Sequence, residues 1–100
     1  MKKVFKYKLL FTDIAEVELP IGAQILTIDE QNKSLENPSE ENHLFIWAIV
    51  DDEEKRTETR RFRISGTGHP LGDFNFKYIN TIPIYNGYEV YHVLEILDEK

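Results

Sequence analysis

The sequence Tyr85-Asn86-Gly87-Tyr88 stands between two runs rich in β-branched and aromatic residues, at positions 74–84 and 89–97. Asn-Gly between such runs indicates a β-hairpin with a two-residue type I′ turn, because both central residues of that turn need a positive φ. The turn also sets the register of the two strands. It places three pairs opposite each other: Pro83 with Val90, Thr81 with His92, and Ile79 with Leu94.

Both faces of this C-terminal hairpin carry apolar residues, so the hairpin needs cover on two sides. A small domain supplies that cover by closing into a barrel or by forming a symmetric homo-oligomer through the hairpin. The sequence upstream of the hairpin is therefore expected to supply more strands.

Alternation of apolar and polar residues predicts those strands. Residues 3–11 place aromatics on one side and lysines on the other, and a second alternating run at 14–19 follows Thr12-Asp13. We expect these two runs to form a hairpin. Further runs lie at 23–28, 43–50 and 56–65. No segment has a helical period, so the sequence predicts an all-β fold, a barrel or sandwich of about seven mostly antiparallel strands.

Two segments stand apart from the alternating pattern. Residues 44–50 are apolar on both faces, which is typical of a central strand that the domain or a partner subunit covers on both sides. Residues 29–42 are polar and contain Asn37-Pro38, which predicts a long loop. Such a loop is either a tolerated insertion or a recognition arm.

Composition limits the class of protein. The 100 residues are 41% hydrophobic and 30% charged, as expected of one globular domain spanning 1–100. Cysteine is absent, which excludes a disulfide framework and a thiolate zinc site. The longest apolar run, 44–50, is too short to cross a bilayer. We expect a protein without a membrane partner.

The net charge of −6 makes long nucleic acid a poor partner, since phosphate binding needs a basic surface. It leaves room for a small anion in a local basic pocket, or for docking on a protein. The arginines of residues 60–63, followed by a glycine-rich loop, are the best candidate for such a pocket.

The candidate ligand-binding residues lie on a strand and on the loop after it: Arg61, Arg63, Ser65, Gly66, Thr67, Gly68 and His69. With Phe62 and Ile64 pointing into the core, the two arginines would stand side by side on the outer face, and Arg60 would face inward. Arginines bind phosphate in a bidentate way, and the loop could offer backbone N–H groups and hydroxyls. The alternative is a tight glycine turn, with arginines paired to Glu16, Glu18 or Glu58 across strands.

No pattern in the sequence predicts catalysis, a metal site or a cofactor. The three histidines, His43, His69 and His92, lack metal-ligand spacing. Ser65 near His69 has no orienting acid beside it. The acidic run at 51–54 lacks the spacing and the glycine of a calcium loop, so a solvated turn explains it better.

Several stretches of the chain together resemble a family of small phage and prophage proteins whose domain has no known function. They are Lys2-Lys3-Val4-Phe5-Lys6-Tyr7, Glu58-Thr59-Arg60-Arg61-Phe62-Arg63, Gly66-Thr67-Gly68-His69-Pro70 and Tyr91-His92-Val93-Leu94-Glu95. The resemblance implies expression in the cytoplasm of an infected bacterium, and it carries no activity with it.

We therefore expect a non-catalytic accessory protein that acts on a host factor, as in counter-defence, by binding and blocking a host or phage protein. The alternative is sequestration of a small phosphorylated ligand, such as a nucleotide immune signal, at the Arg61 and Arg63 surface.

Overall fold

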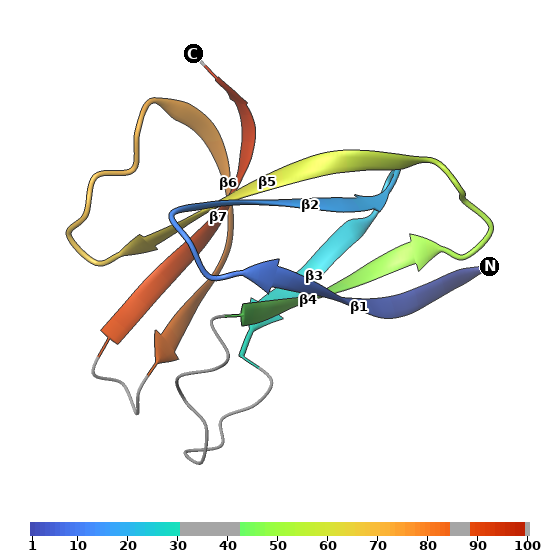
Figure 1. The fold of residues 1–100 in the computed structure, drawn as a ribbon, viewed down its shortest axis with the longest axis horizontal. Coiled ribbons are helices and arrows are strands. Elements are labelled where there is room, and N and C mark those ends of the chain that lie inside the picture. Colours follow the sequence, from blue (N-terminus) through green and yellow to red (C-terminus); the bar gives the residue numbers. More distant parts are fainter. Residues whose placement is uncertain (31–42, 85–88, 100) are drawn as a thin grey trace.

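The computed structural model describes residues 1–30, 43–84 and 89–99. These residues form seven strands and no helix (Figure 1). The strands are β1 (Lys2–Leu10), β2 (Ile14–Pro20), β3 (Gln24–Asp29), β4 (His43–Asp51), β5 (Thr57–Gly66), β6 (Phe74–Ile84) and β7 (Glu89–Glu99). The prediction of an all-β fold is confirmed. The predicted Asn-Gly turn, and the predicted loop beyond Glu30, lie outside the described residues.

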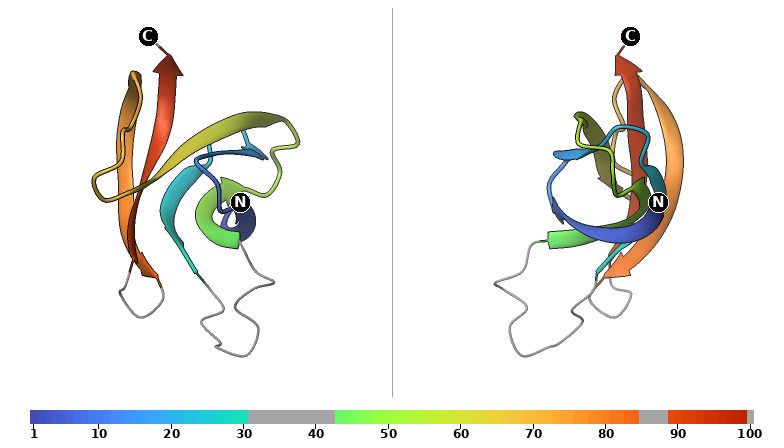
Figure 2. Two further views of the ribbon diagram at one scale, coloured as in Figure 1. Left: turned by 60° about the vertical axis from the view of Figure 1, so that its left-hand side comes forward. Right: turned by 90° about the vertical axis from the view of Figure 1, so that its right-hand side faces the viewer.

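The strands form two antiparallel sheets that enclose the core between them (Figure 2). The three-stranded sheet has the order β1-β4-β3, and the four-stranded sheet has the order β2-β5-β7-β6. Both sheets contribute to one cluster of buried side chains: Leu9, Ala15, Leu19, Ala23, Ile28, Leu44, Ile46, Ala48, Val50, Phe62, Ile64, Ile82 and Val93.

The predicted hairpin of the first two runs is wrong. β1 pairs with β4, and β2 pairs with β5. The turn between β1 and β2 instead carries the chain from one sheet to the other, and the carbonyl oxygen of Asp13 accepts a hydrogen bond from the Ile64 amide at 3.0 Å. Placing the two strands in different layers lets both direct their apolar faces at one core, which buries more apolar surface than a flat hairpin would.

The register of the C-terminal hairpin is confirmed near its turn, where Thr81 lies opposite His92. Farther along, Ile79 opposite Leu94 is wrong, because Tyr78 takes that place. The register shifts between Tyr78 and Asn80, so Ile79 is an extra residue of a β-bulge.

The bulge is followed by a residue that joins the two sheets. Asn80 lies on β6, the edge of one sheet, and Ile28 lies on β3, the edge of the other. The Asn80 side chain accepts a hydrogen bond from the Ile28 amide at 3.2 Å, and its Nδ2 donates to the Ile28 carbonyl at 2.6 Å. An asparagine side chain thus takes the place of a neighbouring strand on the edge of β3.

Candidate functional site

Arg63 lies on the predicted face of β5, but its guanidinium is hydrogen-bonded to backbone carbonyls of the protein itself. Its Nη2 donates to the carbonyl of Pro70 at 2.6 Å, and its Nε donates to that of Leu71 at 3.2 Å. Its Nη1 donates to the carbonyls of Asp13 at 3.1 Å and Ile64 at 2.7 Å. The side chain is 12% exposed. Arg63 therefore holds the loop after β5 and the turn after β1 in place, and little of its guanidinium faces solvent.

Ser65 and Gly66 end β5 beneath that loop. Ser65 pairs with His92 on the outer face, as the alternation predicts, yet it is only 2% exposed. Its hydroxyl donates to the Gly66 carbonyl at 3.3 Å. The His69 ring lies against Gly66, where an added Cβ would be 3.2 Å from Cε1 of the ring. These contacts leave no room for a ligand beside Ser65.

Thr67, Gly68 and His69 form a tight turn. The His69 amide donates to the Gly66 carbonyl at 3.0 Å, and Gly68 has a φ of 87°. Glycine at the third position of a type II turn has this conformation. The Thr67 amide donates to the Val90 carbonyl at 3.2 Å. Two of the N–H groups expected to bind an anion are therefore used within the protein.

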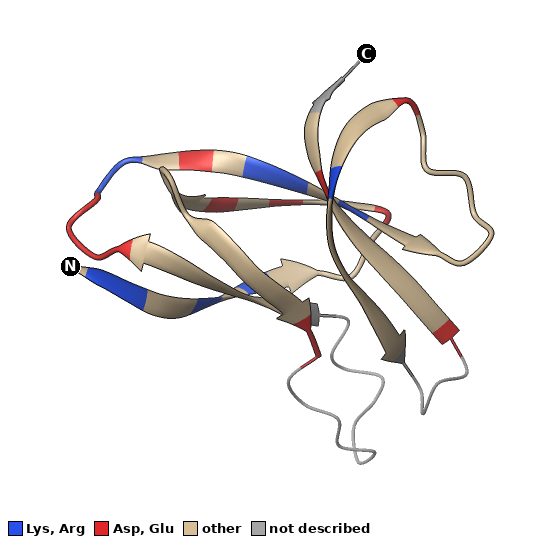
Figure 3. Ribbon diagram, turned by 180° about the vertical axis from the view of Figure 1, so that it is seen from behind, with Lys and Arg blue, Asp and Glu red and all other residues tan. Residues whose placement is uncertain are grey.

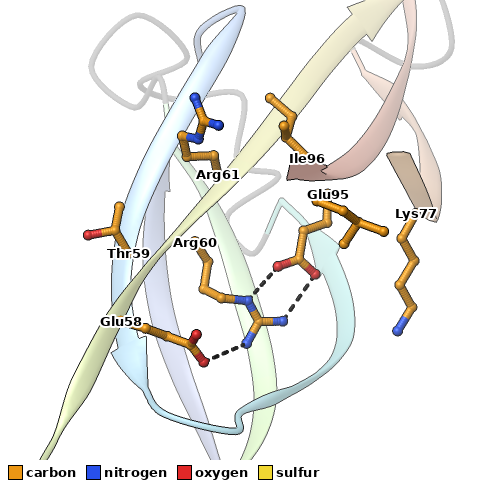
Figure 4. Close-up of a pocket in the computed structure, with 8 residues that line it drawn as sticks. Glu58, Thr59, Arg60, Arg61, Lys77, Glu95 and Ile96 are labelled. Atoms are coloured by element: carbon orange, nitrogen blue, oxygen red, sulfur yellow. Dashed lines mark hydrogen bonds and ion pairs between the residues drawn. The ribbon is translucent and has the colours of Figure 1, made fainter. Parts of the chain in front are cut away.

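Arg61 lies apart from this loop, at a pocket of about 500 Å³ where β5 and β7 diverge (Figure 4). Beside it, Arg60 forms a bidentate ion pair with Glu95 and donates through Nη1 to the Ala23 carbonyl at 2.8 Å. Arg60 faces inward as expected, and Glu95 is 5% exposed. The hydrogen bonds that Arg60 donates to the Glu95 carboxylate raise the pKa of Arg60. In Figure 4 Arg61 points away from this pair.

The Arg60–Glu95 pair was not predicted from the sequence, where Glu16, Glu18 and Glu58 were the expected partners of the arginines. Glu58 does lie 3.7 Å from Arg60. Glu95, however, is 35 residues away, on a strand whose neighbour depends on the whole sheet order. Glu95 stands in an alternating run between the apolar Val93 and Leu97, and that position was the one available indication that it points inward.

His92 belongs to a chain of side-chain hydrogen bonds on the outer face of the four-stranded sheet. Its Nε2 lies 2.9 Å from Thr67 Oγ1, and its Nδ1 lies 3.1 Å from Thr81 Oγ1, which is 2.8 Å from the Tyr78 hydroxyl. This series of hydrogen bonds connects the loop after β5 to the hairpin of β6 and β7. Among the residues that the structure describes, no group of three or more His, Cys, Asp or Glu could hold a metal ion.

The outer face of the three-stranded sheet presents a different surface, which we call the β4 face. Nine side chains form three rows across β1, β4 and β3: Lys8, Phe45 and Asp29; Lys6, Trp47 and Thr27; Val4, Ile49 and Gln24. The residues that alternate with these on β4 are buried in the core. Phe45, Trp47 and Ile49 are partly exposed, and Val4 is 53% exposed.

The β4 face is apolar in the middle and basic on one side. Lys6 Nζ lies 4.8 Å from the centroid of the Phe45 ring, a cation–π contact. The Phe45 and Trp47 ring centroids are 6.3 Å apart. Figure 3 shows lysines along β1, with the acidic turn after β4 beside the N-terminal end of that strand. At that turn Lys3 pairs with Asp52 at 2.9 Å.

Residues 44–50 are apolar on both faces in the sequence, but no site was predicted there. The structure shows that the core covers one face of β4 and that the other is an outer face of the molecule. The lysines of residues 3–11 supplied a further indication, because period-two alternation places Lys6 and Lys8 on the face opposite the core.

The fold and its surfaces define a small all-β domain with one apolar outer sheet face. Residues 1–100 match the family described as "Domain of unknown function (DUF7352)", and the chain belongs to that family. No curated protein and no solved structure matches the chain. In the described part of the chain, no helix is long and apolar enough to cross a membrane.

Proposed function

We propose that the protein is a non-catalytic binding module, and that it acts by binding a protein partner through the β4 face. The observation that carries this proposal is the row Phe45, Trp47 and Ile49, partly exposed on the outer face of a sheet whose other face is the core. Aromatic residues surrounded by a polar rim are typical of protein interfaces.

The contacts in the loop after β5 give less support to sequestration of a phosphorylated ligand. Such a ligand would have to compete with four backbone carbonyls for Arg63. It would also meet the Thr67 and His69 amides already bonded to carbonyls. The loop is better described as a structural connection that Arg63 holds closed.

The proposed setting is the cytoplasm of an infected bacterium. The resemblance of the Arg60–Arg63 and Gly66–Pro70 stretches to small phage and prophage proteins supports it. In this setting the module blocks a host or phage protein, and counter-defence is the proposed consequence. Binding alone is sufficient for such a role, so no catalytic group is required.

Affinity capture from the bacterium that carries the gene tests this function. The protein is compared with a Trp47→Glu variant, which places a charge in the middle of the β4 face, and with Tyr78→Glu as the matched control. Tyr78 is 60% exposed on the other sheet. We expect one captured protein to be lost with Trp47→Glu and kept with Tyr78→Glu. Capture that survives Trp47→Glu and is lost with Tyr78→Glu would overturn the proposal.

A further inference from the structure

The chemistry of the β4 face narrows the kind of partner that it can bind. We infer that the occupant is an amphipathic helix of the partner protein, with its apolar stripe on Phe45, Trp47 and Ile49 and acidic side chains over Lys6 and Lys8. This inference rests on the proposed function and goes beyond it, because it specifies the partner's secondary structure and charge.

Backbone hydrogen bonding favours a helix over an extended segment. β4 is the central strand of its sheet, so β1 and β3 already use its backbone groups on both sides. A partner lying on the β4 face meets side chains only. An extended peptide would bring its own N–H and C=O groups against apolar side chains without partners, whereas a helix satisfies them internally.

The size of the face also suits a helix. Three strands span about 14 Å, and a helix with its side chains is about 10–12 Å wide. From Val4 to Leu10 the sheet extends about 20 Å, which corresponds to roughly 13 helical residues. The resulting area is near 300 Å², which one short helix covers, whereas a standard interface between two globular copies of the chain would need roughly 800 Å² per partner, more than the β4 face offers.

The distribution of charge sets the orientation of the helix. Lys6 and Lys8 line the β1 side of the apolar row, while Gln24, Thr27 and Asp29 line the β3 side. A helix with acidic residues on one flank and neutral or basic residues on the other matches both sides.

The same face is a poor platform for single-stranded nucleic acid. Phe45 and Trp47 could stack on bases, but the third member of the row, Ile49, and its neighbour Val4 cannot. The net charge of −6 also opposes the approach of a phosphate backbone. The apolar and basic groups together fit an acidic protein segment better.

A display library of 16-residue helical peptides, randomised on both flanks of a leucine stripe, tests the inference without a known partner. Peptides are selected on the wild-type protein. Binding is then measured by fluorescence of Trp47, the one tryptophan in the chain. We expect the enriched peptides to carry Asp or Glu on one flank and to shift the Trp47 emission.

Two variants then test the role of the lysines. Lys6→Gln/Lys8→Gln neutralises the basic side, and Lys55→Glu, outside the β4 face, changes the net charge by the same amount. We expect the first to weaken binding by about three- to thirtyfold and the second to leave it nearly unchanged. Enriched peptides without an acidic excess, or equal binding by both variants, would overturn the inference.

Two further outcomes assign the face to another occupant. A twelve-nucleotide thymidine oligomer that shifts the Trp47 emission more strongly than the peptides would overturn the inference in favour of nucleic acid. A dimer seen by analytical ultracentrifugation and dissociated by Trp47→Glu would overturn it in favour of a second copy. If cellular capture depends on Trp47 but the Lys6→Gln/Lys8→Gln variant binds normally, the inference that the partner helix is acidic is wrong, while the proposed function stands.

Discussion

Asn80 on β6 makes both hydrogen bonds of a strand pair to Ile28 on β3, although the two residues belong to different sheets. The two bonds join the open edges of the sheets, on the side of the molecule away from the β1–β2 turn. The connection holds β3, which supplies one side of the β4 face.

We predict that Asn80→Ala destabilises the protein by about 1–3 kcal/mol, because the Ile28 amide and carbonyl lose their partner while partly buried. Hydrogen exchange of the Ile28 amide should become faster than that of other β3 amides, and urea denaturation gives the free energy of unfolding. Gln24→Ala, an exposed change on the same strand, serves as the control. Unchanged exchange at Ile28 would contradict the edge connection.

Arg63 is predicted to be a structural arginine. Arg63→Lys keeps the charge but cannot reach four carbonyl oxygens, so we expect a loss of about 1–3 kcal/mol in the free energy of unfolding. Arg56→Lys is the matched control, because Arg56 is 76% exposed and pairs only with Glu54 in the contacts described. Thermal melting compares the two. An Arg63→Lys variant as stable as the wild type would return Arg63 to the list of candidate ligand-binding residues.

The Arg60–Glu95 pair should be costly to break from one side. Glu95→Ala leaves the Arg60 charge mostly buried without its main partner, for which about 3–5 kcal/mol is expected. Replacing both, as Arg60→Met/Glu95→Leu, should recover much of that loss, since two apolar side chains can fill the space. Urea denaturation of the single and double variants measures the difference. A double variant less stable than either single variant would argue against this account.

The acidic turn after β4 gives a prediction for pH. The hydrogen bond from Lys3 is the main reason why the pKa of Asp52 is lowered from 3.8. A lowered pKa in the folded state means that the pairing stabilises the protein above pH 3.8 and that this contribution is lost as the pH falls through the folded value. NMR titration should show the pKa of Asp52 rising in Lys3→Ala and staying low in Lys3→Arg. Equal pKa values in both variants would refute the pairing.

Much of the fold could be predicted from local patterns. Alternating runs, the apolar run at 44–50 and the β-rich runs around the Asn-Gly turn located the seven strands. Alternation also gave the inward direction of Phe62 and Ile64, which are 0% and 2% exposed. The register near the hairpin turn was also predictable, because a two-residue turn determines its immediate neighbours. The bulge at Ile79 was not, since an extra residue in a run of β-forming residues changes no local pattern.

Long-range relationships account for most of what the sequence did not reveal. β1 and β2 are adjacent in the chain but belong to different sheets, because that arrangement lets both strands bury their apolar faces in one core. The candidate arginines were placed on the correct face, yet their partners could not be foreseen. Arg63 is hydrogen-bonded to backbone carbonyls of two separate segments. Because every residue has such a carbonyl, the residue types do not indicate which ones will accept a hydrogen bond.

Photo-crosslinking in the producing cells tests the central claim most directly. A benzoylphenylalanine in place of Gln24 lies at the edge of the β4 face, in the row of Ile49 and Val4, while the same group in place of Tyr78 lies on the opposite sheet. We predict a discrete adduct with one protein from position 24, abolished by Trp47→Glu, and none from position 78. An adduct from position 78 alone would contradict the assignment of the β4 face as the binding surface.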